Sequence, residues 1–312
     1  MKKNWLYFLL KLTVSCALII YIMSNFQLEQ LFHRLENIEL WHLFSATMIF
    51  VLLMFNNTLR WYIVINAIGS ALPYKISFKI FYIGLFFNQT LPSSVGGDAV
   101  RIYLANKEGL SLTSAINSVL LERIATLLGL IILVVICQPL LTSKMGGDHT
   151  QLIFPLLFIL SVTGIICLMF LDRLPEKLTR FRILAGISTL GRSAKKLFLS
   201  PANAARAIIL GITGNVILSL IVFLLSQSLF LNLSFLDCLV LIPPVVLVST
   251  IPISIAGWGV REAAMITLLA LVGVAKADAF VLSVLFGLLT FGLSLPGGIV
   301  WIIGGYKVDD TK

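Results

Sequence analysis

The chain has 312 residues, of which 59% are hydrophobic and only 12% are charged. Soluble domains carry about 25% charged residues, so this composition excludes an ordinary soluble domain and predicts a membrane protein. The net charge of +9 would suit a nucleic-acid-binding protein, but the basic residues lie between apolar runs, as in the cytoplasmic loops of membrane proteins. We therefore expect no nucleic-acid partner.

Apolar runs of about 20 residues recur along the chain, and each is long enough to cross a bilayer as a helix. They predict six full spans, at residues 5–24, 41–66, 114–141, 151–171, 207–231 and 279–304. The first run follows a basic start, Lys2 and Lys3, but lacks a convincing cleavage site, so we interpret it as a retained span. Two further regions, 76–109 and 235–273, are broken by polar residues. The sequence predicts one all-α polytopic membrane domain over residues 1–312.

A basic connector covers residues 172–206. Because cytoplasmic loops are enriched in Lys and Arg, we expect the connector and both chain termini on the cytoplasmic side of the cell's inner membrane. An apolar stripe at helical spacing favours an interfacial helix lying on the anionic leaflet. The stripe consists of Leu174, Leu178, Phe181 and Leu184. The alternative is a solvated basic connector.

Each broken region has two apolar arms joined by a polar elbow. An arm of about 10–16 helical residues is about 15–24 Å long, which reaches the middle of a bilayer but often not its far side. Non-helical backbone at that depth is tolerated where it is buried in protein or lines a wet cavity. We therefore expect two re-entrant broken-helix hairpins. The alternative is a pair of ordinary short spans with a surface turn.

The two elbows resemble each other in sequence. Residues 91–101, LPSSVGGDAVR, align without a gap with residues 251–261, IPISIAGWGVR, and share five identities in eleven columns. The identical pairs are Pro92/Pro252, Ser94/Ser254, Gly97/Gly257, Val100/Val260 and Arg101/Arg261. The flanking spans also follow the same order. We therefore expect an inverted repeat, with copies at about 41–141 and 207–304, which is a recurring transporter design.

The composition of the elbows predicts hinges and an anion site. Pro92 and Pro252 disfavour helix at the preceding residue, and Gly96 and Gly259 permit tight turns, so these four residues are the expected hinges. A helix that begins at bilayer depth points free N–H groups and the positive end of its dipole inward. Such a terminus favours an anion.

An arginine follows each elbow. Arg101 and Arg261 are expected in the first helical turn, where a cation opposes the dipole and needs a negative partner. That partner is a carboxylate of the protein, a phosphate of a substrate, or each in turn. A purely structural ion pair is the alternative. Asp98 is also a good N-cap for a helix beginning at Ala99. We expect Asp98 or Glu122 to hold Arg101 when no anionic headgroup is bound.

The predicted substrate-binding residues are Asn88, Ser94, Gly97, Asp98, Arg101, Glu122, Arg123, Ser254, Gly257, Trp258, Arg261 and Glu262. Arg60, near the end of its span, is interpreted as snorkelling to the headgroups. The four cysteines and three histidines have no metal-ligand spacing, so we expect no metal site and no catalytic residue.

Residues 86–130, FFNQTLPSSVGGDAVRIYLANKEGLSLTSAINSVLLERIATLLGL, and residues 251–264, IPISIAGWGVREAA, resemble the lysylphosphatidylglycerol synthase/flippase membrane-domain family. In the bifunctional members of that family, the membrane domain flips an aminoacylated phospholipid that a separate cytosolic domain makes. No stretch of this sequence resembles the synthase domain. The resemblance therefore implies flipping without synthesis.

The expected function is translocation of a phospholipid or another lipid-linked anionic headgroup across the membrane, without a cofactor. The partners would be membrane lipids, with a homodimer or a partner envelope enzyme also open. One alternative is a non-catalytic scaffold or regulator of envelope lipid machinery. Another is a polyprenyl-phosphate glycosyltransferase, but the sequence has no nucleotide-binding loop, no DxD motif and no metal-binding motif.

Overall fold

The computed structural model describes residues 38–91, 96–145, 153–173, 182–250 and 258–304, and their regular secondary structure is helical, as predicted. The helices are α3 (Leu40–Ala67), α4 (Tyr74–Thr90), α5 (Gly96–Lys107), α6 (Leu112–Met145), α7 (Ile153–Phe170), α9 (Arg182–Phe198), α10 (Pro201–Ser228), α11 (Phe235–Ser249), α12 (Val260–Leu269) and α13 (Lys276–Ile303). Two 3₁₀ turns, η2 (Leu171–Arg173) and η3 (Ala270–Val272), extend α7 and α12.

Five helical segments in the described residues are long and apolar enough to cross a membrane: Leu40–Ala67, Leu112–Pro139, Pro155–Arg173, Pro201–Ser228 and Lys276–Ile303. They correspond to the predicted second to sixth spans, so the chain is a multi-pass membrane protein. The predicted fifth span, 207–231, begins too late. Its helix, α10, already begins at Pro201, and proline is favoured in the first turn of a helix. The predicted first span, 5–24, lies outside the described residues.

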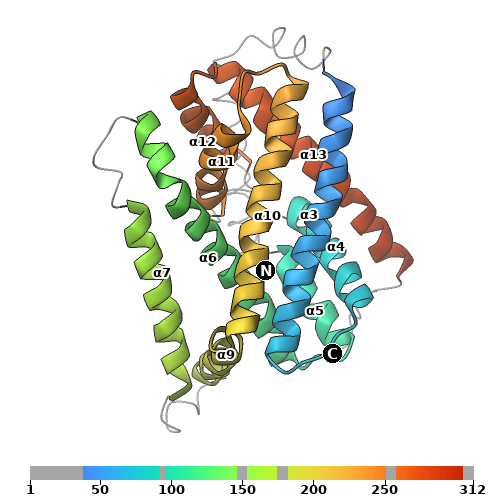
Figure 1. The fold of residues 1–312 in the computed structure, drawn as a ribbon. Coiled ribbons are helices and arrows are strands. Elements are labelled where there is room, and N and C mark those ends of the chain that lie inside the picture. Colours follow the sequence, from blue (N-terminus) through green and yellow to red (C-terminus); the bar gives the residue numbers. More distant parts are fainter. Residues whose placement is uncertain (1–37, 92–95, 146–152, 174–181, 251–257, 305–312) are drawn as a thin grey trace, which may run out of the picture.

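Each predicted broken region is a pair of short helices packed against each other, α4 with α5 and α11 with α12. At 1.5 Å per residue these helices are about 15–25 Å long, whereas the 28-residue spans are about 42 Å long. Figure 1 shows the first hairpin, α4 and α5, in the lower half of the bundle and the second, α11 and α12, in the upper half. α13 packs against both α4 and α12 and so connects the two hairpins.

The long helices pack through close backbone contacts. α3 and α10 run antiparallel, and the Glu39 N–H at the start of α3 donates to the Ser228 carbonyl at the end of α10 (3.0 Å). α6 crosses α10 where Gly129 faces Gly211: a Cβ on Gly129 would lie 2.7 Å from the Gly211 carbonyl carbon. Small residues allow such approaches between membrane helices, where apolar burial supplies little drive for association.

The basic connector contains α9, which packs against the bundle through Ser188, Gly191, Ala194 and Leu197. Lys195 Nζ pairs with Asp172 at the end of α7 (2.7 Å), and Lys196 Nζ donates to the Ile68 carbonyl that caps α3 (3.1 Å). Of the predicted interfacial stripe, only Leu184 is in the described residues. In the described residues the connector therefore contains a helix packed against the bundle, and its last residues, 201–206, already belong to α10.

Candidate functional site

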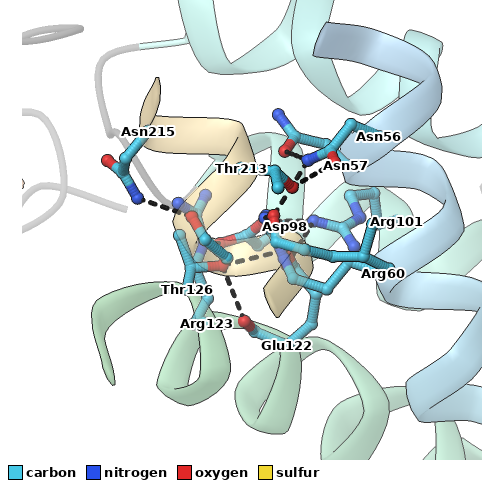
Figure 2. Close-up of polar contacts among 12 residues, drawn as sticks. Asn56, Asn57, Arg60, Asp98, Arg101, Glu122, Arg123, Thr126, Thr213 and Asn215 are labelled. Atoms are coloured by element: carbon cyan, nitrogen blue, oxygen red, sulfur yellow. Dashed lines mark hydrogen bonds and ion pairs between the residues drawn. The ribbon is translucent and has the colours of Figure 1, made fainter. Parts of the chain in front are cut away.

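Five charged side chains beside the first hairpin form one network of alternating sign, the first-hairpin network (Figure 2). Its members, in order of contact, are Arg60 of α3, Glu122 of α6, Arg101 and Asp98 of α5, and Arg123 of α6. Glu122 accepts from Arg60 Nη2 at 2.6 Å and from Arg101 Nη1 at 3.3 Å. Asp98 accepts from Arg101 Nη1 at 3.3 Å and from Arg123 Nε at 2.8 Å.

The network is buried and carries an excess of positive charge. Four of its side chains are 3–7% exposed, whereas the Arg123 side chain is 43% exposed. Three guanidinium groups face two carboxylates, which leaves one positive charge without a counter-charge inside the network. Charged groups inside a membrane protein face inward, pair with one another and mark substrate pathways. An excess of one sign at such a place favours a ligand of the opposite sign.

Arg101 has hydrogen-bonding capacity to spare. Its Nη1 serves both carboxylates, but its buried Nε and Nη2 have no hydrogen-bond acceptor in the described part of the chain. The guanidinium lies 4.4 Å from the Trp61 ring centroid and 4.7 Å from that of Phe81, so two aromatic rings help to hold it. Two free donors at the edge of a fixed planar group suit a phosphate or carboxylate oxygen pair.

The interpretation of Arg60 as a snorkelling residue is wrong. Arg60 is 3% exposed and bonds to Glu122, and its Nη1 donates to the Leu210 carbonyl of α10 at 3.2 Å. Asn56 donates to the same carbonyl at 2.9 Å and accepts from Thr213 at 2.9 Å (Figure 2). Sequence reasoning missed Asn56 and Thr213, although an amide one turn before an arginine in an apolar span is a signal for a buried polar contact.

The first-hairpin helix α5 begins earlier than predicted. It starts at Gly96 rather than Ala99, so Asp98 lies within its first turn instead of capping it, and Arg101 lies beyond that turn. The cap comes from α4, because Asn88 Oδ1 accepts from the Gly97 N–H at 2.9 Å. A Cβ on Gly97 would collide with the carbonyl oxygen of Gly84, so glycine is needed where the two helices cross.

The second hairpin has a smaller polar cluster. Arg261 donates to Glu262 from Nη2 (2.6 Å) and Nε (3.2 Å), and Ser283 of α13 contacts both residues. Glu262 also accepts from the N–H of Gly259 at 2.5 Å, and Gly259, the residue just before α12, has a φ of 88°. The Arg261 guanidinium lies 4.9 Å from the Trp258 ring centroid. Arg261 therefore lies in a first turn, as predicted, but its charge is balanced by its neighbour.

The two hairpins differ in charge despite their sequence match. In the alignment of 91–101 with 251–261, Asp98 corresponds to Trp258, so the second copy lacks that carboxylate. Its carboxylate, Glu262, is completely buried and bonds within its own helical turn. The second cluster is thus a neutral pair, and the excess positive charge belongs to the first hairpin alone among the described residues.

Several predicted site residues lie outside the described residues, namely Pro92, Ser94, Pro252, Ser254 and Gly257. The structure brings Asn88, Gly97, Asp98, Arg101, Glu122 and Arg123 together at one hairpin and Trp258, Arg261 and Glu262 together at the other. In the described ranges, no group of three or more His, Cys, Asp or Glu side chains could hold a metal ion.

Comparison with known proteins supports a membrane-lipid context. The chain matches the model of a family described as the lysylphosphatidylglycerol synthase TM region over residues 8–297, which includes both hairpins. No curated protein matches the chain. A family with this description indicates a function related to membrane lipids. Because the match covers far more than half of the 312 residues, the chain belongs to the lysylphosphatidylglycerol synthase transmembrane-region family.

Proposed function

We propose that this protein moves a lipid with a phosphate-bearing headgroup between the leaflets of the cytoplasmic membrane, without a covalent step. The observation that carries the proposal is the buried first-hairpin network, which has one more arginine than carboxylates and, on Arg101, two donors without an acceptor among the described residues. The site must stay folded without substrate and must still bind an anion. A network with three arginines and two carboxylates meets both needs. The carboxylates hold the arginines in the empty state, while the excess charge attracts phosphate.

In this proposal the phosphate binds Nε and Nη2 of Arg101, the two atoms that have no acceptor in the described residues. Asp98 keeps Arg123 and Glu122 keeps Arg60, so binding would not leave either carboxylate without a cation. The contacts of 3.3 Å from Arg101 Nη1 to the two carboxylates are the longest in the network, and they would break as the guanidinium moves toward a phosphate bound at Nε and Nη2. This exchange could release α5 from α6 and change access to the site. We place the α9 end of the bundle in the cytoplasm, because α9 and its flanks are basic.

The test is lipid movement by purified protein in vesicles that contain a trace of fluorescent phosphatidylglycerol. A membrane-impermeant reductant bleaches only the outer leaflet, so movement appears as loss of the protected signal. Wild-type protein should accelerate this loss over empty vesicles. Arg101→Gln should lower the rate at least tenfold. Arg101→Lys should keep the charge but lose the planar fork, and should retain an intermediate rate.

Arg206→Gln is the matched control, because Arg206 is an exposed arginine near the start of α10. It should move lipid at the wild-type rate. Wild-type vesicles that bleach like empty ones would refute the function. A wild-type rate in Arg101→Gln would instead remove Arg101 from the site. If Arg101→Gln does not fold, the Lys variant decides, because a folded Lys variant with an unreduced rate contradicts recognition through the guanidinium fork.

A further inference from the structure

Every buried carboxylate in the described residues already has a hydrogen-bond partner. These carboxylates belong to Asp98, Glu122, Asp237 and Glu262. The first two bond to arginines of the first-hairpin network, and Glu262 bonds to Arg261. Asp237 accepts from Ser234 in the capping box of α11. Within this part of the chain, no buried carboxylate is therefore left over to pair with a cationic group of a ligand.

The membrane segments outside the described residues add no acidic side chain. The two elbow segments, 92–95 and 251–257, contain no Asp or Glu, and neither does the predicted first span, 5–24. The first-hairpin network itself has three arginines and two carboxylates. An ammonium group brought to this network would meet an excess of like charge. Burying it there without a counter-charge would cost several kcal/mol.

A pair of amides adjoins the network on α3. Asn56 uses both ends of its amide: Nδ2 donates to the Leu210 carbonyl at 2.9 Å and to Asn57 Oδ1 at 3.3 Å, while Oδ1 accepts from Thr213 at 2.9 Å. Because Asn57 Oδ1 accepts from Asn56, the other end of the Asn57 amide is a donor. This Nδ2 has no acceptor in the described part of the chain.

Asn57 lies close to the arginines. A Cβ on Gly214 of α10 would lie 3.1 Å from Asn57 Oδ1 and 3.3 Å from Arg60 Nη1, so both side chains face the same point of α10. Asn57 is also one helical turn before Trp61, whose ring centroid is 4.4 Å from the Arg101 guanidinium. Figure 2 shows Asn57, Arg60 and Arg101 in one group of polar side chains. An uncharged donor therefore lies beside the cationic network.

The unused polar atoms of this group are N–H donors. They are Nε and Nη2 of Arg101 and Nδ2 of Asn57. A ligand that satisfies them must supply acceptors. Phosphate oxygens do so, and so do the hydroxyl oxygens of a glycerol or a sugar. An ammonium group has three donors and no acceptor, so it fails in hydrogen bonding as well as in charge.

We propose that the lipid of the first-hairpin network is an anionic lipid whose headgroup carries a phosphate and hydroxyl groups but no ammonium. Asn57 binds a headgroup hydroxyl while Arg101 binds the phosphate. Phosphatidylglycerol has this chemistry, and lysylphosphatidylglycerol does not. The statement rests on the proposed function, because it names the class of lipid that this site takes. Binding of that lipid is nevertheless measurable without transport.

The binding experiment is native mass spectrometry of the full chain in detergent. The protein is mixed with equal amounts of phosphatidylglycerol, lysylphosphatidylglycerol and phosphatidic acid with the same acyl chains, at a concentration that gives mostly single adducts. We expect at least tenfold more adducts with phosphatidylglycerol than with the lysyl lipid, and at least threefold more than with phosphatidic acid, which lacks the hydroxyls. Equal adducts with the lysyl lipid would overturn the exclusion of ammonium. Equal adducts with phosphatidic acid would overturn recognition of a hydroxyl.

Two substitutions test Asn57. Asn57→Asp keeps the shape but replaces the free donor by a carboxylate, and should lower the preference for phosphatidylglycerol over the lysyl lipid at least fivefold. Asn57→Ala removes the donor without adding charge. It should abolish the preference over phosphatidic acid and still reject the lysyl lipid. Unchanged preferences in both variants would remove Asn57 from the site. If Asn57→Asp does not fold, the Ala variant decides.

Asn66→Asp is the matched control, because Asn66 is an exposed asparagine on the same helix and its Nδ2 donates to the Tyr62 carbonyl at 2.8 Å. It should keep the wild-type preferences. The transport assay, repeated with fluorescent lysylphosphatidylglycerol, separates this inference from the proposed function. If wild-type protein moves both lipids equally fast, the exclusion of ammonium is wrong and the function stands. If the binding preferences hold but wild-type protein moves no lipid, the class of bound lipid stands and the function is wrong.

Discussion

Glu122 is the residue on which the first-hairpin network depends most. Its carboxylate contacts both Arg60 and Arg101, and its side chain is 3% exposed. Removing one partner of a buried ion pair costs about 3–5 kcal/mol, because the remaining charge stays buried without compensation. The same removal here leaves three arginines facing Asp98 alone. The stability of the network is therefore a matter of charge balance rather than of any single bond.

Glu122→Gln should lower the free energy of unfolding by about 3–5 kcal/mol. Adding Arg60→Met to it should restore part of the loss, because the double variant again has one excess positive charge. Thermal unfolding in detergent measures both variants and the Arg60→Met single variant as a double-mutant cycle. Additive losses would show that the two residues do not share one balance of charge.

Gly287→Ala should destabilise the protein by about 1–3 kcal/mol, as other overpacked sites do. A Cβ at position 287 would collide with Nη2 of Arg261 and lie 2.9 Å from the Trp258 ring, which pushes the guanidinium off Glu262. Gly292→Ala, on the same helix, meets nothing within 4 Å and should be neutral or stabilising by about 0.5–1 kcal/mol. The same unfolding measurement compares the two. Equal behaviour of both alanine variants would contradict tight packing around Arg261.

At the scale of the helices, the start of α5 depends on α4. The Gly97 N–H lies in the first turn and so has no acceptor within its own helix. It donates to Asn88, which is nine residues earlier in the chain and lies on the other arm of the hairpin. α11, in contrast, is capped locally: Ser234 and Asp237 form a capping box, with Asp237 N–H donating to Ser234 Oγ at 3.1 Å. A local capping box is visible in a sequence, whereas a cap supplied by a packed neighbour is not.

Asn88→Ala should cost about 1 kcal/mol of stability, the usual loss for a helix cap. Asn88→Asp keeps an acceptor for the same N–H and puts a negative charge at a helix N-terminus, so it should retain the wild-type stability. Chemical denaturation in detergent would detect the difference. The cap would be disproved by an Asp variant as unstable as the Ala variant.

At the scale of the whole molecule, the two hairpins lie in opposite halves of the bundle (Figure 1) and differ in charge. The first carries the excess positive charge and the more exposed Arg123, and the second carries the neutral pair of Arg261 and Glu262. If both hairpins re-enter the membrane, as the sequence predicts, their tips approach its middle from opposite sides. An anion that enters at the first hairpin would then meet little net charge at the second, which favours release.

Spin labels on Thr90→Cys and Thr250→Cys test this arrangement. These exposed threonines lie at the ends of α4 and α11, close to the two elbows. In vesicles, both labels should collide with oxygen much more often than with a water-soluble nickel reagent, because oxygen concentrates in the middle of a bilayer. Strong collision of both labels with the nickel reagent would favour ordinary short spans with surface turns, unless the tips open to water. A cysteine-free background that retains lipid movement is the required control.

Within the described residues, the sequence alone determined which segments are helices and which of them can span a membrane. Apolar runs of about 20 residues have few stable alternatives in a bilayer, where backbone groups must be paired internally. The same reasoning located both hairpins, because turn formers and charges are rare in apolar segments. It also selected Asp98, Arg101, Glu122 and Arg123, since intramembrane charges mark functional sites by default.

The tertiary structure alone decided how these charges pair and where helix α5 begins. Arg60 is an ion-pair partner of Glu122 instead of a snorkelling residue, because α3 and α6 meet at that level, 62 residues apart in the chain. Asn88 replaces Asp98 as the cap of α5, because the crossing at Gly97 brings α4 within hydrogen-bonding distance. The partners of a buried polar group are chosen by which helices lie beside it, and local sequence contains no record of that choice.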